Sequence, residues 1–393
     1  MLEAAIDEAI ENDSDLLVEA TSNQVNHRGG YTGMKPDHFC RRVSDIAAVK
    51  GLNSSRLIFG GDHLGPNPWQ SRPASEAMRE AELMVEAFVR AGCQKIHLDA
   101  SMACADEKGP LSNETIARRA AQLCNAAERS AGARKPLYVI GTEVPTPGGA
   151  TESLTNLEVT SSESAAATVA MHCDIFAEMG LGQAWPRVIS LVVQPGVEFN
   201  HDSVVDYVPE RALHLTELLK QEETLVYEAH STDYQRPEAF RWLVRDGFAI
   251  LKVGPALTFA MREALSALSL IEEQLVAARQ RSRLMEVVER AMIENPHEWE
   301  RHYSGDRRTV QLLRRYSYSD RIRYYWNVEP VKSAVSTLMS NLLPMAIPEP
   351  LLSAFLPEQY HAVRAGILQS DARSLVIHRI RSVLKPYADA CRA

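Results

Sequence analysis

"RLIFGGDHLGPNPWQ" (residues 56–70) joins a short apolar run to an adjacent aspartate and histidine, Asp62 and His63, and then to a turn rich in glycine and proline. Such a run is typical of a strand that is buried on both faces of a parallel sheet. Ionisable side chains are costly inside such a strand, but at its carboxyl end they line the site that α/β folds place there. We therefore expect Asp62 and His63 to face a pocket, with the turn shaping a rigid loop over it.

This strand pattern recurs along the chain and alternates with amphipathic helical patterns. Residues 75–92 carry apolar side chains at spacings of three and four and end at Gly92, which predicts a helix. The predicted strands are 15–22, 56–63, 95–101, 136–144, 188–196, 224–231 and 248–258. Strand and helix in alternation imply parallel strands covered by helices, as in a TIM (β/α)8-type barrel or a doubly wound sheet. No G-x-G-x-x-G motif follows the first strand, which favours the barrel.

The strand count raises a question, because seven strands are visible and a closed barrel of this type has eight. The sequence opens with a helical pattern, residues 1–13. We expect either that the first strand is missing from this chain, or that the barrel stays open between the first and last visible strands. After residue 280 the alternation stops, which predicts a barrel domain over 1–280 and a helical C-terminal extension over 281–393.

Composition limits the classes of partner. The 393 residues have a formal charge of -9 and no long run of lysine or arginine, which argues against binding to nucleic acid or to an anionic membrane. A small-molecule substrate is the better expectation. Six cysteines lack CxxC spacing, and the N-terminus lacks a signal-peptide pattern, so we expect reduced thiols and a cytoplasmic location. No stretch approaches the ~20 apolar residues that a transmembrane helix needs.

Ionisable residues stand at the ends of most predicted strands. They are Glu19, Asp62, His63, His97, Asp99, Glu143, Glu228, His230 and Lys252. Pairs two residues apart, such as Glu228 and His230, point to the same side of a strand, so these ends are expected to build one polar pocket.

Histidines among carboxylates suit a divalent metal, and we expect ligands from His63, His97 and His230. Zinc is the usual ion for imidazole-rich sites, and manganese fits when more oxygens take part. A bound metal polarises a carbonyl, while a carboxylate moves the proton. We assign that catalytic work to Asp62, Glu143, Glu228 and Lys252.

Two lysines receive separate interpretations. Lys252 interrupts an apolar strand, so its ammonium reaches the pocket or a buried carboxylate. It either forms a Schiff base with a carbonyl substrate, or makes an ion pair with Glu228 or Glu19, or contacts a phosphate. Lys95 opens its strand and is expected at the opposite end of the barrel, in solvent.

Two further segments are candidates for anion or partner contacts. The loop "NHRGGYTGMKP" (26–36) could cradle an anion with Arg28 or act as a lid. In the extension, "RRYSYSDRIRYYW" (314–326) interleaves arginine with aromatic residues. Such interleaving occurs in nucleic-acid sites, but the acidic chain favours a packing or subunit-interface role, or a phosphate contact.

Several segments together resemble the Z-type subunit of class II D-tagatose-1,6-bisphosphate aldolase. They run in order from residue 19 to 326: "EATSNQVNHRGGYTGM", "GGDHLGPNPWQ", "KIHLDASMACA", "YVIGTEVPTPGG", "VVQPGVEF", "VYEAHSTDYQ", "ILKVGPALTFAMREA" and "YSDRIRYYW". The resemblance implies a TIM barrel and a role in galactitol and amino-sugar breakdown, as the accessory partner of a separate zinc aldolase subunit. Some members are labelled tagatose 6-phosphate kinases, and related proteins are associated with 4-epimerisation of ketose phosphates. The family pattern includes an upstream strand that this chain lacks.

Three hypotheses follow. The preferred one is an accessory aldolase subunit whose pocket holds a ketose phosphate of the tagatose or fructose series, with a homo-oligomer left open. The substrate-binding residues would be Glu19, Asn23, Arg28, Asp99 and Gln194. The second is a stand-alone metal-dependent ketose-phosphate 4-epimerase or aldolase, and the third is its Schiff-base version through Lys252. The sequence contains no P-loop and no protein-kinase motif set, which argues against the kinase label.

Overall fold

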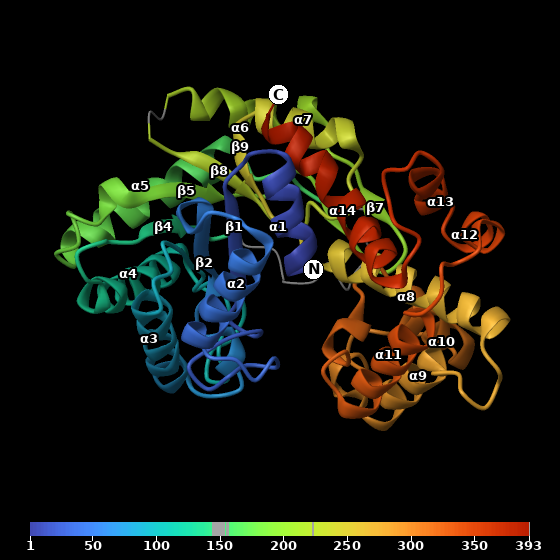
Figure 1. The fold of residues 1–393 in the computed structure, drawn as a ribbon. Helices are drawn as coiled ribbons and strands as arrows, with labels where there is room; N and C mark the ends of the chain where they lie inside the picture. The colour runs from blue at the N-terminus through green and yellow to red at the C-terminus, as the bar shows by residue number, and fades with distance from the viewer. Residues whose placement is uncertain (144–153, 155–156, 222–223, 393) are drawn as a thin grey trace.

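The computed structural model describes residues 1–143, 154, 157–221 and 224–392. Its centre is a seven-stranded parallel sheet, in the order β1-β2-β3-β4-β5-β8-β9, that curls into a half-barrel (Figure 1). The strands are β1 (Leu16–Thr21), β2 (Leu57–Leu64), β3 (Lys95–Leu98), β4 (Leu137–Ile140), β5 (Val188–Val192), β8 (Val226–Ala229) and β9 (Phe248–Leu251). All seven predicted strands are confirmed, although most end earlier than predicted, and Val144 of the fourth lies outside the described residues.

Helices connect the strands and cover the convex face of the sheet (Figure 1). They are α2 (Pro36–Lys50), α3 (Ala74–Arg90), α4 (Asn113–Ser130), α5 (Ser162–Glu178), α6 (Pro209–Leu219) and α7 (Pro237–Arg245). Helix α3 buries Ala77, Met84 and Phe88, as its apolar spacing predicts. The short elements are η1 (Ser54–Arg56), η2 (Asn67–Trp69), η4 (Trp185–Arg187) and the antiparallel pair β6 (Glu198–Phe199) and β7 (Val204–Val205).

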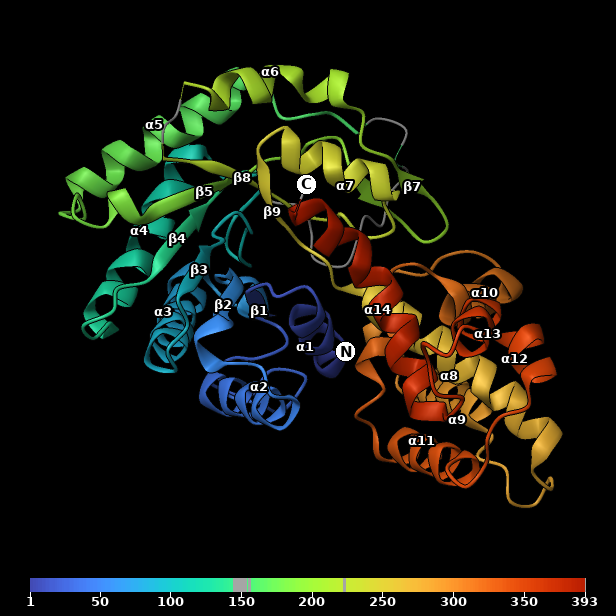
Figure 2. The same cartoon turned by 45° about the horizontal axis from the view of Figure 1, so that its top comes forward.

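The sheet is open along one seam. Within the described residues β1 and β9 are its two edges and are not hydrogen-bonded to each other, which agrees with the expectation of a barrel left open between the first and last visible strands. Helix α14 (Ala372–Cys391) packs between α1 (Leu2–Glu11) on one side and α7 and α8 (Pro255–Leu275) on the other (Figure 2). Its Arg381 lies 2.9 Å from Glu8 of α1. The C-terminal helix therefore joins the two sides of the open barrel from outside.

The C-terminal region has a hydrophobic core of its own. Its further helices are α9 (Leu284–Glu294), η5 (Pro296–Glu298), α10 (Arg307–Tyr316), η6 (Arg321–Tyr324), α11 (Glu329–Leu342), α12 (Glu349–Phe355) and α13 (Pro357–Arg364). Leu268 and Ile271 of α8 share this core with Leu338 of α11. Residue 280, the predicted domain boundary, falls between α8 and α9. Helices α8 and α14, however, pack against both the half-barrel and the C-terminal helical region.

Two sequence-level expectations concern the whole chain. No helix in the described part of the chain is both long and apolar enough to cross a lipid bilayer. All six cysteines are free thiols, as their spacing predicts.

Candidate functional site

The end of β2 explains how two adjacent residues face one pocket. In a regular strand Asp62 and His63 would point to opposite faces. The pairing of β2 with β3 shifts register between Gly61 and Leu64, and His63 has a φ of 48°. A bulge of this kind re-aims side chains, and a non-glycine residue in the left-handed region costs of order 1–3 kcal/mol. The local backbone is strained, and both side chains reach the same polar cluster.

Strand stagger brings an unexpected lysine into this cluster. Glu19 of β1 pairs with Gly60 of β2, which pairs in turn with Lys95 of β3. Because Gly60 has no side chain, the Glu19 side chain lies over it, and Lys95 Nζ lies 2.9 Å from Glu19 Oε1 and 2.6 Å from Glu228 Oε2. The expectation that Lys95 lies in solvent is wrong, since the side chain is only 4% exposed. A strand's first residue lies deep in the barrel when its neighbours are staggered.

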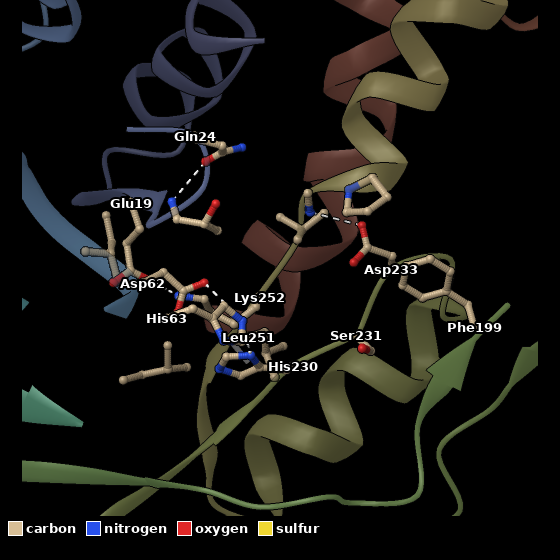
Figure 3. Close-up of a pocket in the computed structure, with 16 residues that line it drawn as sticks. Glu19, Gln24, Asp62, His63, Phe199, His230, Ser231, Asp233, Leu251 and Lys252 are labelled. Atoms are coloured by element: carbon tan, nitrogen blue, oxygen red, sulfur yellow. Dashed lines mark hydrogen bonds and ion pairs between the residues drawn. The ribbon is translucent and has the colours of Figure 1, made fainter. Parts of the chain in front are cut away.

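Lys252 lies among three carboxylates, of which Figure 3 shows Glu19 and Asp62. Its Nζ contacts Glu19 Oε2 and lies 3.1 Å from Asp62 Oδ1 and 3.7 Å from Glu228 Oε1. Burial alone lowers the pKa of Lys252, but the surrounding carboxylates outweigh it and raise the pKa above that of a free lysine. The ammonium form has no lone pair for a Schiff base, so this arrangement favours the ion-pair interpretation.

Two histidines and two carboxylates form a continuous chain of polar contacts. His63 Nδ1 lies 2.8 Å from Asp99 Oδ2, His63 Nε2 lies 3.2 Å from His230 Nδ1, and His230 Nε2 lies 2.9 Å from Glu228 Oε1. Three hydrogen bonds need three protons, and two neutral imidazoles supply only two.

The electrostatic environment indicates which imidazole holds the third proton. Burial opposes the charged form of His63, but Asp62 and Asp99 outweigh it and raise the pKa of His63. Burial lowers the pKa of His230 to about 4. These directions favour His63 over His230 as the imidazole that carries the third proton.

Four buried side chains offer a set of metal ligands. One ligand atom from each of Asp62, His97, Glu228 and His230 lies within 4.8 Å of the others. His97 Nδ1 faces both Asp62 Oδ1, at 3.0 Å, and the backbone N–H of His63, at 3.2 Å, while its Nε2 is buried and unpartnered among the described residues. Either tautomer of His97 leaves a polar atom unsatisfied, which is costly in a buried site.

The donor set fits a divalent cation. It combines two imidazoles with two carboxylates, as zinc and manganese sites do. Burial opposes ionisation of Asp62 and Glu228, but Lys252 and the neighbouring cations outweigh it and lower the pKa of both carboxyl groups. Both are therefore ionised at neutral pH and able to bind a metal without first losing a proton.

A pocket of about 270 Å³ opens beside the cluster, between the edge strands β1 and β9. Figure 3 shows Glu19, Asp62, His63, His230 and Lys252 gathered on one side of it and Asp233 and Phe199 on the other. The lining is Leu17, Glu19, Thr21, Gln24, Asp62, His63, Phe199, His230, Ser231, Asp233, Ile250, Leu251, Lys252, Val253, Gly254 and Pro255. Glu19 and Thr21 face it together, as their spacing predicts.

Sequence reasoning missed Asp233 and Gln24, which lie in the loops after β8 and β1. Asp233 Oδ1 accepts hydrogen bonds from the backbone amides of Gly254 and Ala256 at the start of α8, at 3.0 and 2.8 Å. Burial raises the pKa of Asp233 to about 6 despite these amides. The only signal for either residue was its position just beyond a strand end.

Two predicted site residues lie in a separate network. Glu143 is exposed and accepts hydrogen bonds from Thr160 and Ser164, at 2.5 and 2.6 Å. Gln194 Oε1 accepts hydrogen bonds from the backbone amides of Gly196 and Val197, at 2.8 and 3.0 Å. The side chain therefore stabilises the turn that follows it. The structure does not bring either residue to the polar cluster.

The glycine-rich loop also places its polar residues elsewhere. Asn23 is exposed to solvent. The guanidinium of Arg28 is paired with Glu80 of α3, with Nε 2.8 Å from Oε2. An anion at this loop would compete with that carboxylate, so Arg28 is not free to serve the expected anion cradle.

Two comparisons with known proteins match nearly the whole chain. The sequence pattern of the "D-tagatose-1,6-bisphosphate aldolase subunit GatZ/KbaZ-like" family matches residues 1–392. A solved structure described as a probable tagatose 6 phosphate kinase from Sinorhizobium meliloti 1021 is 47% identical, with a TM-score of 0.92 over 99% of this chain and 97% of that chain.

Two solved aldolases are far more distant. Fructose-bisphosphate aldolase from Campylobacter jejuni is 14% identical over 87% of this chain and 84% of its own, with a TM-score of 0.42. The YdjI aldolase from Escherichia coli K12 is 11% identical over 86% and 88%, with a TM-score of 0.35. Neither similarity is strong enough to say anything about this chain, whereas the first two findings cover nearly all of it. The chain belongs to the D-tagatose-1,6-bisphosphate aldolase subunit GatZ/KbaZ-like family.

Proposed function

We propose that this chain binds a ketose phosphate and a divalent cation as an accessory component of a D-tagatose-1,6-bisphosphate aldolase. In this role it works beside a catalytic aldolase subunit in galactitol and amino-sugar breakdown. The observation that carries the proposal is the buried group of Asp62, His97, Glu228 and His230 at the wall of the pocket. Family membership supports the pathway.

The donor chemistry of the cluster favours zinc, held by Asp62, His97, Glu228 and His230. The bound ion would supply Lewis acidity toward a sugar carbonyl or hydroxyl oxygen. His63 would position His230 through their 3.2 Å contact, and Asp99 would fix His63 in turn.

Glu19 and Lys252 are the residues that would meet the sugar itself. Both line the pocket, so sugar hydroxyls can donate to the Glu19 carboxylate and accept from the Lys252 ammonium. A volume of about 270 Å³ holds a short carbon chain but is small beside the roughly 300–1,000 Å³ of usual ligand sites. The pocket is therefore poorly suited to a nucleotide, which agrees with the absence of a P-loop and argues against kinase activity.

A second candidate function is a stand-alone metal-dependent ketose-phosphate 4-epimerase or aldolase. The concentration of buried ionisable groups favours it, because burying charge costs stability and a purely supporting subunit has no need of it. In retro-aldol cleavage a hydroxyl loses its proton as the adjacent carbon–carbon bond breaks. Glu19, a pocket carboxylate outside the metal ligand set, would accept that proton, and re-addition to the other carbonyl face would invert the centre.

Metal analysis and turnover assays separate these functions. We expect one equivalent of metal per purified chain, binding of tagatose and fructose phosphates by calorimetry, and cleavage of tagatose bisphosphate only after the catalytic subunit is added. Glu228→Gln should lose metal, and Glu143→Gln is the matched control that should keep it. Turnover by the chain alone, abolished by EDTA, would replace the accessory role with the second function. ATP-dependent phosphorylation of tagatose 6-phosphate would overturn both.

A further inference from the structure

Two neighbouring arginines of η6, Arg321 and Arg323, lack a carboxylate partner. No Asp or Glu oxygen of the described residues lies within 4.0 Å of either guanidinium, although Arg321 is only 8% exposed. Arg321 Nη1 donates to the carbonyl of Glu298 at 2.8 Å, but its Nε is buried and unpartnered in the described chain. Asp320, the adjacent acid, is engaged instead by Arg262, at 2.8 Å.

Arg323 keeps one edge of its guanidinium available. Its Nη1 donates to the carbonyls of Ser319 and Asp320, and its Nη2 donates to the hydroxyl of Tyr324 at 2.9 Å. These bonds leave Nε–H and one Nη2–H without a partner in the described part of the chain. Arginine has five donors in a planar fork that suits phosphate and carboxylate oxygens.

The two guanidiniums are held together on one ring. The central carbon of Arg321 lies 5.7 Å, and that of Arg323 4.5 Å, from the centroid of the Tyr324 ring. Burial and the nearby arginines lower the pKa of His302 to about 4. Asp320 and Glu298 lie near enough to act on these charges, but neither forms an ion pair with Arg321 or Arg323, so donors of both guanidiniums stay free for a bound anion.

This segment reaches the rim of the pocket on one side through the glycine-rich loop. The rings of Tyr31 and Tyr324 meet edge to face at 4.8 Å. The amide of Tyr31 donates to the carbonyl of Asn23 at 2.9 Å. Gln24, which follows Asn23 in the chain, lines the pocket.

On the other side the segment contacts the loop after β8. The hydroxyl of Tyr234 donates to the carbonyl of Tyr318 at 2.7 Å, and its ring lies 5.2 Å from that of Phe199. Both Phe199 and Asp233, the neighbour of Tyr234, line the pocket. Residues 318–324 therefore lie against two walls of the pocket mouth.

The pocket lining offers a phosphate little attraction. Among the residues that the structure describes, it contains the carboxylates of Glu19, Asp62 and Asp233 but no arginine, and the one lysine, Lys252, is matched by carboxylates. Without a bound metal, a dianionic group against this lining would meet more carboxylates than cations. The cations able to receive it lie outside, on η6.

We propose that Arg321 and Arg323 bind the phosphate of a sugar phosphate whose carbon chain enters the pocket. The ligand class rests on the proposed function, whereas the anion site rests on the two unmatched guanidiniums. Their combined charge of about +2 matches a phosphate monoester, which carries about -1.5 to -2 at neutral pH, better than a carboxylate. This assignment gives the arginine-aromatic segment 314–326 a binding role.

Calorimetry on the full metal-loaded chain tests the site, with tagatose 6-phosphate, unphosphorylated tagatose and inorganic phosphate as ligands. We expect Arg323→Gln to weaken tagatose 6-phosphate and inorganic phosphate by about 10- to 100-fold. Affinity for tagatose and metal content should stay unchanged. Arg323→Lys, which keeps the charge, should retain part of the phosphate affinity. A partial affinity in this variant shows that the loss in Arg323→Gln comes from the missing charge and not from a folding defect.

A neighbouring arginine provides the matched control. Arg314 is paired with Glu289, so Arg314→Gln should leave phosphate affinity unchanged. Tagatose 6-phosphate bound equally well by wild type, Arg323→Gln and Arg321→Gln would overturn the phosphate site while leaving the proposed function standing. Arginine-dependent binding of inorganic phosphate without binding of any ketose phosphate would support the anion site and overturn the proposed function instead.

Discussion

Replacement of Lys95 by methionine tests the buried charge network directly. Lys95 Nζ lies 2.9 Å from Glu19 Oε1 and 2.6 Å from Glu228 Oε2, and all three side chains are at most 9% exposed. Methionine keeps most of the volume but removes the charge, so the two carboxylates share only Lys252. Breaking a buried ion pair from one side typically costs 3–5 kcal/mol. At about 1.4 kcal/mol per tenfold change, the folding equilibrium should shift by roughly two to four powers of ten.

Urea unfolding followed by circular dichroism measures this loss. Lys135→Met is the control, because Lys135 is largely exposed and lies 3.7 Å from Glu128, a pair expected to contribute at most about 1 kcal/mol. The double variant Lys95→Met with Glu228→Gln should recover much of the stability, since it removes the stranded charge as well. A Lys95→Met protein as stable as wild type to within about 1 kcal/mol would refute the buried network.

Three further predictions address single residues. His97→Ala should weaken metal binding at least about 100-fold in equilibrium dialysis, with His378→Ala as control, and equal metal content in both would exclude His97 as a ligand. Burial raises the pKa of Asp233 from 3.8 to about 6, so the folded protein favours the protonated carboxyl. The contribution of this protonated carboxyl to folding stability is complete below about pH 4 and is lost as the pH rises to 6. Asp233→Asn, which stays neutral, should therefore stabilise the fold by up to roughly 3 kcal/mol at pH 7 and not at all below pH 4; an equal gain at both pH values would contradict the raised pKa. Arg28→Ala should leave sugar-phosphate affinity within about twofold, because Glu80 already occupies its guanidinium, and a larger loss would restore the anion cradle that the sequence suggested.

Local signals were enough to find the strands and the polar residues at their ends. Apolar runs bounded by glycine and proline depend only on neighbours in sequence, so β2 and its terminal Asp62 and His63 could be predicted from the printed residues. Side-chain alternation likewise placed Glu228 and His230 on one side of β8. Their 2.9 Å contact bears out that placement.

Features that depend on strand pairing could not be predicted in this way. Lys95 seemed to lie in solvent because position along a single strand says nothing about stagger against its neighbours. The register Glu19–Gly60–Lys95 decides that it is buried. Glu143 looks like the other strand-end acids in sequence, yet its loop turns it toward Thr160 and Ser164.

The sequence by itself determined the parallel α/β architecture, the succession of strands along the chain and the polar character of their carboxyl ends, because apolar periodicity acts between near neighbours. Tertiary structure alone decided that the sheet stays open between β1 and β9, that His97 faces Asp62, and that no carboxylate of the described residues pairs with Arg321 or Arg323. These arrangements depend on contacts between residues far apart in the chain. No local pattern encodes the register or helix packing that brings such residues together.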